Sequence, residues 1–244
     1  MHIMRKSPGK LSFLAGLLSF ALLVGTGCSK TGSTVTTSPV TYVSFINASA
    51  LSSNVTVLLN DTAATVSGGI APGRFSPKYG TVHPGSYDVK FEVASTDSLL
   101  SEISTSAFDT LNFYTLMLYS VPGTGAVQST KILDDFSTLS TSAANYRFFN
   151  LCSTHSRVDL YLNTTLVQQG RTTADNANNI SLNGFQTTNS GIYTVTAKSA
   201  GTDSVIVSVG NISLAGGNAY TIFLSGVDGS SANPLLLNVL QASY

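Results

Sequence analysis

Apolar and polar residues alternate with a period of two along most of the chain that follows its first forty residues. In the segment VDLYLN, for example, Val158, Leu160 and Leu162 fall on one face, whereas Asp159 and Tyr161 fall on the other. A period of two with one apolar face is typical of antiparallel strands that are half buried on a core. We therefore expect an all-β protein.

The strand pattern occurs twice, in the same order. Three pairs of blocks carry the repeat: VTVLLN at 55–60 with VDLYLN at 158–163, GSYDVK at 85–90 with GIYTVT at 191–196, and FYTLML at 113–118 with AYTIFL at 219–224. The offset is 103 in the first pair and 106 in the other two, so about three residues are inserted within the second copy. An internal repeat of this kind indicates repeated structural units. Short strands with regular Pro-Gly turns favour two tandem antiparallel immunoglobulin-like β-sandwiches.

These patterns divide the chain into five segments. We predict a signal peptide at 1–27, a flexible tether at 28–40, a first sandwich at 41–136, a linker at 137–144 and a second sandwich at 145–244. The tether is polar and rich in Ser and Thr, a composition that favours a flexible coil.

The N-terminus has the three parts of a bacterial export signal. Arg5 and Lys6 precede an apolar run, Leu11–Val24, and the small residues Gly25–Gly27 lead into Cys28. The apolar run is too short to span a bilayer. A cysteine at this point resembles a lipobox, although Gly25 stands where Leu is usual. We expect lipidation of Cys28, hence a membrane contact through a lipid anchor, in the outer membrane and facing the periplasm or the surface. The alternative is cleavage after Gly27, which would leave a soluble periplasmic protein.

Charge limits the classes of partner. Only 10% of the residues are charged, and the chain from Cys28 onward has nine Lys and Arg against twelve Asp and Glu, a net charge of −3. A nucleic-acid partner requires clustered basic side chains to neutralise phosphates. We therefore exclude nucleic acid and expect an unknown surface protein or a glycan as the partner.

The order of motifs resembles that of the DUF4397 family. A strand ending in F-x-N is followed by V-D-L-Y-L-N, G-x-Y-x-V, G-T-D-S-V and A-Y-T. The second copy fits better, because the first has Thr56 at the position of Asp159 and Leu58 at that of Tyr161. Members of this family are β-sandwich domains of bacterial surface and secreted proteins, often in tandem behind a lipoprotein signal. The resemblance implies a fold and a location but no activity.

One group of residues contains every member of a thiol nucleophile set: Cys152, His155 and Asp159. A catalytic thiol needs an adjacent base and a group that orients the base. These residues lie close together in sequence just before and within a strand, and the first copy has Ser49 in place of Cys152. We favour a small buried residue and a loop histidine, and predict no enzymatic activity.

Metal ligands are sparse in the sequence. His83 and His155 stand alone, without the paired spacing of zinc sites. Asp134-Asp135 falls near the predicted linker, and 175–179 is an oxygen-rich Asp-Asn-Ala-Asn-Asn run. Calcium takes such ligands, but strings of Asp and Asn are also turn formers. We predict no metal and no cofactor.

Two features of the sequence are compatible with glycans, one with binding a glycan and the other with carrying one. The chain has no Trp, but Tyr79, Tyr146 and Tyr161 are candidates for stacking on a sugar, and Tyr161 should point outward from its strand. Its alternative role is packing across strands. Four Asp-Ser or Asp-Thr steps resemble an O-glycosylation acceptor, or form turns; they begin at Asp61, Asp97, Asp109 and Asp203. The preferred expectation is a structural, adhesive or assembly lipoprotein, and the alternative is a glycan-binding lipoprotein associated with polysaccharide uptake.

Overall fold

The computed structural model describes residues 38–242, apart from residues 66 and 179. Residues Ser38–Tyr244 form one compact unit. The predicted signal peptide, Cys28 and the tether up to Thr37 lie outside the described residues. The all-β prediction is confirmed, because strands are by far the main secondary structure of the described residues, which contain only one short helix and one 3₁₀ turn besides. Among them, no helix has the length and apolar character needed to cross a membrane.

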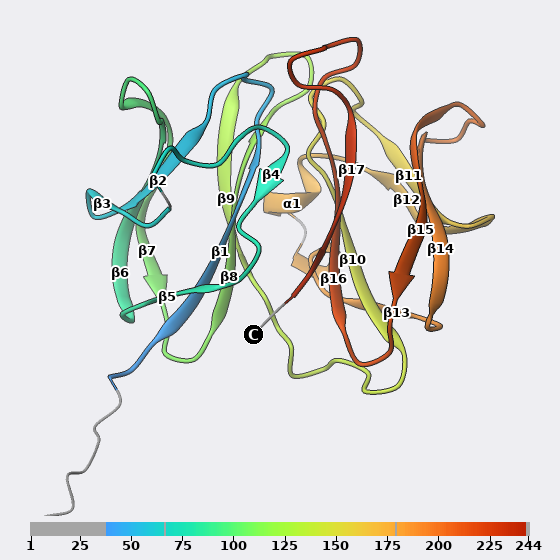
Figure 1. The fold of residues 1–244 in the computed structure, drawn as a ribbon, viewed down its shortest axis with the longest axis horizontal. Helices are drawn as coiled ribbons and strands as arrows, with labels where there is room; N and C mark the ends of the chain where they lie inside the picture. Colours follow the sequence, from blue (N-terminus) through green and yellow to red (C-terminus); the bar gives the residue numbers. More distant parts are fainter. Residues whose placement is uncertain (1–37, 66, 179, 243–244) are drawn as a thin grey trace, which may run out of the picture. The chain divides into compact units, whose positions relative to one another are not determined.

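The first half contains two sheets (Figure 1). In sheet order, its outer sheet is β3 (Thr62–Ala63), β2 (Val55–Leu59), β6 (Gly85–Val93) and β7 (Ser98–Phe108). Its inner sheet is β4 (Arg74–Phe75), β1 (Thr41–Ala48), β8 (Phe113–Ser120) and β9 (Val127–Leu133), with β5 (Gly80–Val82) also paired to β1.

The second half repeats this plan. Its outer sheet is β12 (Thr165–Arg171), β11 (Val158–Leu162), β14 (Gly191–Ser199) and β15 (Val205–Leu214). Its inner sheet is β13 (Gln186–Thr188), β10 (Ala144–Asn150), β16 (Ala219–Ser225) and β17 (Leu236–Gln241). Between β12 and β13 lie the short helix α1 (Asp175–Asn178) and a single 3₁₀ turn, Ile180–Leu182.

One pairing in each inner sheet departs from the antiparallel prediction. β1 runs parallel to β8, and β10 runs parallel to β16, with Phe45 opposite Leu116 and Phe148 opposite Ile222. The other strand pairs are antiparallel. The chain leaves the inner sheet after its first strand and starts the outer sheet. It then adds a short edge strand to the inner sheet (β4 and β5, or β13), completes the outer sheet, and returns to pair in parallel with that first strand. The period-two pattern is the same for either direction, so it could not reveal this connection.

An asparagine ends the first strand of each half and makes the same contacts in both. Asn47 donates from Nδ2 to the carbonyl of Ile70 (2.8 Å), and Asn150 donates in the same way to Arg171 (3.1 Å). The Oδ1 of each asparagine accepts the backbone N–H of the residue two positions later. The F-x-N motif therefore joins the end of an inner strand to the chain segment that returns beside it.

A tyrosine near the start of β6 and of β14 also repeats its contact. The hydroxyl of Tyr87 donates to the carbonyl of His83 (2.8 Å), and that of Tyr193 donates to the carbonyl of Asn189 (2.7 Å). A tyrosine bonded to a carbonyl a few residues upstream is a tyrosine corner, a feature of immunoglobulin-like sandwiches. It explains why the G-x-Y block is present in both copies.

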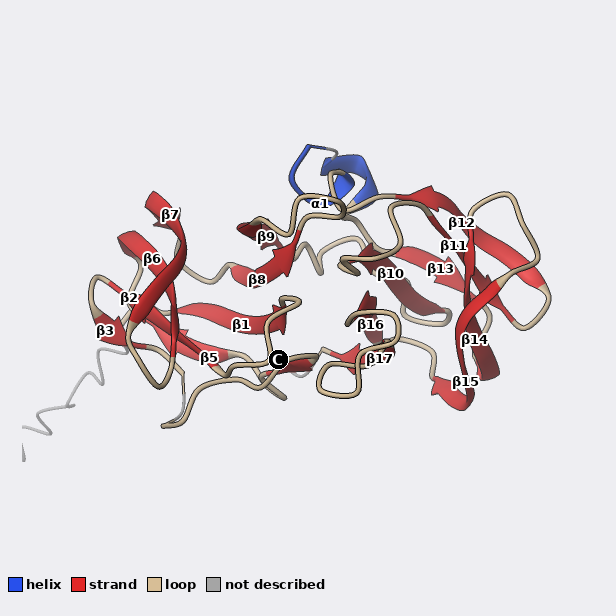
Figure 2. Ribbon diagram, turned by 90° about the horizontal axis from the view of Figure 1, so that it is seen from above, coloured by secondary structure: helices blue, strands red, loops and turns tan. Residues whose placement is uncertain are grey.

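Three apolar clusters hold the unit together. One lies between the two sheets of each sandwich. The third joins the two inner sheets and is made of Ile46, Ala48, Met117, Tyr119, Ile132, Phe149, Leu151 and Phe223. Figure 2 shows the resulting order of layers: outer sheet, inner sheet, inner sheet, outer sheet. β10 and β16 are buried at every position for this reason.

Candidate functional site

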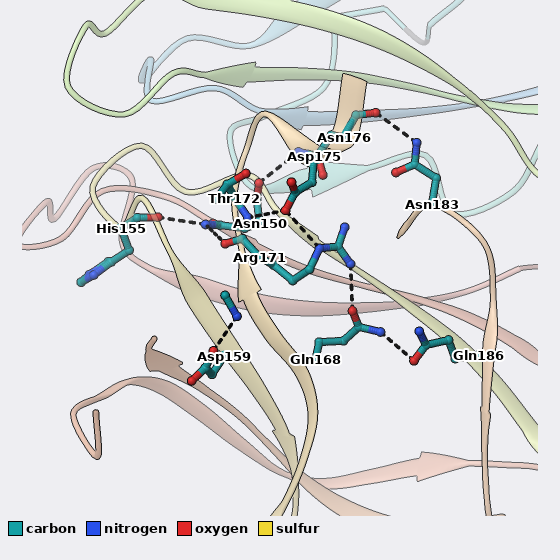
Figure 3. Close-up of polar contacts among 11 residues, drawn as sticks. Asn150, His155, Asp159, Gln168, Arg171, Thr172, Asp175, Asn176, Asn183 and Gln186 are labelled. Carbon is teal, nitrogen blue, oxygen red and sulfur yellow. Dashed lines mark hydrogen bonds and ion pairs between the residues drawn. The ribbon is translucent and has the colours of Figure 1, made fainter. Parts of the chain in front are cut away.

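The candidate thiol set of Cys152, His155 and Asp159 is not brought together as a nucleophile, its base and the group that orients the base. Cys152 is fully buried, and its Sγ lies 3.4 Å from the carbonyl oxygen of Gly226 and 3.3 Å from the hydroxyl of Thr154. The carbonyl of His155 accepts a hydrogen bond from Asn150, whereas its ring points away from Asp159 (Figure 3). Attack by this thiol on an external substrate would require the sandwich to open.

Asp159 has a structural role that its sequence position did not indicate. Its Oδ1 accepts the N–H of Gly170 (2.6 Å), and its Oδ2 accepts the N–H of Gly201 (2.9 Å). One carboxylate thus links β11 to the neighbouring strand β12 and to the turn after β14. Hydrogen bonds to an ionised acceptor are among the strongest in proteins, so Asp159 stabilises this side of the outer sheet.

A group of hydrogen-bonded polar side chains surrounds Arg171, at the end of β12 (Figure 3). Its side chain is 2% exposed, its Nε lies 3.5 Å from Oδ2 of Asp175, and its Nη1 donates to Gln168 (3.0 Å). Gln168 in turn donates to Oε1 of Gln186 on β13 (2.8 Å). Burial lowers the pKa of Arg171, and the adjacent Asp175 opposes that change.

The described part of the oxygen-rich run, Asp175–Asn178, forms α1 and supports this network. Asp175 accepts the N–H of Thr172 (2.8 Å), and the side-chain amide of Asn176 donates to the carbonyl of Asn150 (3.1 Å). Asn183 donates to the carbonyl of Asn176 (3.1 Å). The side chains of Asp175 and Asn176 are thus engaged with the backbone of neighbouring segments. Across the described residues, no three His, Cys, Asp or Glu side chains gather closely enough to hold a metal ion.

Sequence reasoning missed Arg171 and Gln168. The segment TLVQQGR offered little signal, because it does not alternate between apolar and polar residues, and its two buried positions, 168 and 171, are three residues apart. The network has a structural role, because Arg171, the last residue of β12, is paired with Asp175 at the start of α1. Arg171 itself is buried, whereas the carboxylate of Asp175 remains 23% exposed.

The three candidate tyrosines lie in different environments. Tyr146 is 3% exposed and bonds Gln186 (3.3 Å), and Tyr79 donates to Asp134 (2.6 Å). Tyr161 is half buried on the outer sheet of the second half, where the ammonium of Lys198 lies 4.6 Å from its ring centroid. Tyr161 is therefore the candidate best placed on an outer face, with one side of its ring already in contact with a cation.

The four Asp-Ser and Asp-Thr steps all lie at the surface. Their hydroxyl residues, Thr62, Ser98, Thr110 and Ser204, are exposed. Asp61 and Asp97 have positive φ angles of 63° and 54°, as expected in tight turns. The turn interpretation explains the residues without a glycan, and the exposure leaves the hydroxyl groups accessible.

Part of the chain matches a known domain family. Residues 41–161 match the model described as "Domain of unknown function (DUF4397)". The matched residues cover the first sandwich together with β10 and β11 of the second, although the motifs had favoured the second copy. No curated protein matches the chain. Through residues 41–161, this chain belongs to the DUF4397 family.

Proposed function

We propose that this protein is a non-enzymatic lipoprotein of the cell envelope with a structural, adhesive or assembly role. The observation that carries the proposal is the third apolar cluster, which packs Phe149 and Phe223 of one sandwich against Met117 of the other. A buried apolar joint keeps the two outer sheets at a fixed separation. An assembly or adhesion module benefits from such rigidity, because its binding surfaces are then pre-organised.

The proposed anchor is a lipid on Cys28, which would place the protein at the outer membrane. The first strand begins at Thr41, so residues 28–40 would separate the membrane from the sandwich. More than one acyl chain is needed for stable anchoring. Labelling of growing cells with a radiolabelled fatty acid should mark the wild-type protein and not Cys28→Ser. Label retained in Cys28→Ser would refute an anchor at this residue.

The role itself is tested in the native host. We expect that deleting the gene lowers attachment or surface assembly, that the wild-type chain restores it, and that Cys28→Ser does not. Full restoration by Cys28→Ser would contradict a membrane-held role. A hydrolytic activity of the purified protein that disappears in Cys152→Ala would contradict the non-enzymatic assignment.

Glycan binding is the second candidate, supported by the position of Tyr161 on an outer sheet. A glycan array read with wild type, Tyr161→Ala and Leu58→Ala separates the two roles, because Leu58 occupies the matching position of the first copy. Reproducible binding that is lost only in Tyr161→Ala would favour the glycan role. Binding by none of the three proteins would remove it.

A further inference from the structure

A pocket of about 280 Å³ opens in the first sandwich, beside the edge of β1 that carries β4 and β5. Val43 and Phe45 form its floor from β1, and Ile70 and Phe75 contribute to its walls. Val43, Phe45 and Ile70 also belong to the apolar core of this sandwich. The pocket is therefore an apolar recess that reaches from the surface to the core.

The two copies differ at this point in a way that explains the pocket. In the first copy Val43 pairs with Gly80 across β1 and β5, and both residues line the pocket. In the second copy the equivalent pair across β10 and β13 is Tyr146 with Gln186. The hydroxyl of Tyr146 bonds Gln186 there (3.3 Å). Two large side chains thus stand where the first copy has a valine and a glycine.

The covering strand is also shorter in the first copy. β3 has two residues, whereas β12 has seven and contributes Gln168, which reaches Gln186 at 2.8 Å. The edge of β2 is still paired beyond β3, through Ala64 with Val57 and through Ile70 with Val55. The residues that line the pocket beside this edge include the small side chains of Ala64 and Thr65.

Backbone contacts hold the wall of the pocket in place. Ile70 and Val55 exchange two backbone hydrogen bonds (2.8 and 2.9 Å), and Asn47 bonds the carbonyl of Ile70. Gly69, at a φ of 70°, lies so close to β2 that a Cβ would stand 2.6 Å from the carbonyl oxygen of Val55. A wall fixed in this way gives a pre-formed site, which lowers the entropy cost of binding.

One cation accompanies the apolar lining. Arg74 of β4 lines the pocket and is exposed, so it stands at the opening, and it forms no ion pair with another described residue. Arg is suited to bidentate recognition of a carboxylate. The volume lies near the lower limit of about 300 Å³ for small-molecule pockets, so the pocket suits one small apolar group that carries a single anionic end.

We propose that the first sandwich binds the anion of a medium-chain fatty acid in this pocket. The aliphatic chain lies against Phe45, Ile70 and Phe75, and the carboxylate pairs with Arg74. Burial of the chain supplies affinity in proportion to the apolar area removed from water. The single charge at the opening orients the ligand with its polar end toward solvent.

Calorimetric titration of the full chain with decanoate tests the proposal. Cys28→Ser serves as the background, so that no acyl chain attached to the protein competes. We expect saturable binding at one site. Arg74→Gln should weaken it roughly tenfold, the size of one lost charged hydrogen bond, and decanol should bind wild type about as weakly as decanoate binds Arg74→Gln. Arg157→Gln, a change at another exposed arginine, should leave binding unchanged.

The second copy supplies a variant that fills the pocket. Val43→Tyr combined with Gly80→Gln should abolish decanoate binding, and Ala71→Leu gives an independent obstruction if the double variant does not fold. Absence of saturable binding to the wild-type background would overturn the proposal. So would decanoate binding that survives a folded pocket-filling variant, or equal affinities of decanol and decanoate for wild type. Binding of an apolar peptide in place of decanoate would identify a protein partner and overturn it as well.

Discussion

Nη1 of Arg147 lies 2.7 Å from Oδ1 of Asp134, and both side chains are almost completely buried, with 1% and 0% exposure. Arg147 belongs to β10 of the second sandwich, whereas Asp134 follows β9 of the first. Oδ2 of Asp134 also accepts hydrogen bonds from Tyr79 and Thr115, both at 2.6 Å. The guanidinium packs over Phe185, with 4.6 Å to the ring centroid. A buried ion pair therefore joins the two sandwiches beside the third apolar cluster.

Removing one partner of this pair should be costly. We expect Arg147→Ala to lower the free energy of unfolding by about 3–5 kcal/mol, because Asp134 is left as an uncompensated buried charge. The measurement is urea unfolding followed by circular dichroism. Ser44→Ala, at the matching position of the first copy, is the control and should cost less than about 1 kcal/mol.

The double variant Arg147→Met, Asp134→Asn distinguishes the effect of the ion pair from the effect of the packing around it. Because both charges are removed together, it should be more stable than Arg147→Ala, with a coupling energy of at least about 1 kcal/mol in the double-mutant cycle. Additive effects of the two single changes would contradict a direct interaction between these side chains.

Alkaline stability should depend on Tyr79. Burial, followed by the charge of Asp134, raises the pKa of Tyr79 above its ordinary value of 10.0. Above pH 10 the unfolded chain therefore releases this proton while the folded protein keeps it. The stability that the group contributes is complete below that pH and falls above it, by about 1.4 kcal/mol per pH unit. Tyr79→Phe should show a shallower loss of unfolding free energy above pH 10, and identical slopes would contradict this assignment.

The joint between the sandwiches should make unfolding cooperative. Phe148 and Phe149 are adjacent on β10, but Phe148 belongs to the core of its own sandwich and Phe149 to the third cluster. Both Phe→Ala changes should cost about 3–5 kcal/mol. We expect the wild type to unfold in a single calorimetric transition. Only Phe149→Ala should divide that transition into two, because it weakens the contact between the two sandwiches and not one sandwich alone. A single transition in Phe149→Ala would contradict the prediction, because it would show that contacts other than the third apolar cluster couple the unfolding of the two sandwiches.

The carboxylate of Asp159 should be needed for the stability of the second outer sheet. Asp159→Ala leaves the N–H groups of Gly170 and Gly201 without their acceptor and should cost about 2 kcal/mol in urea unfolding. Thr56→Ala, the equivalent change in the first copy, is the control. Equal effects of the two changes would argue that the links to Gly170 and Gly201 contribute little.

The strands and the repeat of the protein could be predicted from the sequence. The period-two alternation predicted strands, because a strand turns successive side chains to opposite faces. The repeated blocks predicted two equivalent halves. Asn47 and Asn150 make equivalent contacts in their own halves, as do Tyr87 and Tyr193, which explains why those blocks recur. Each of these residues bonds a segment of its own half, and the repeat keeps the order of those segments the same in both halves.

The relations between distant segments were decided only by tertiary structure. The near-continuous apolar run of β16 indicates burial on both faces, but not which sheet covers the second face. The parallel pairing of β1 with β8, the ion pair between Arg147 and Asp134, and the pocket beside Val43 all depend on residues brought together from separate strands. Period and propensity describe one strand at a time. A joint or a pocket arises from the packing of several strands, and its chemistry lies at positions such as Val43 and Tyr146, where the two copies differ.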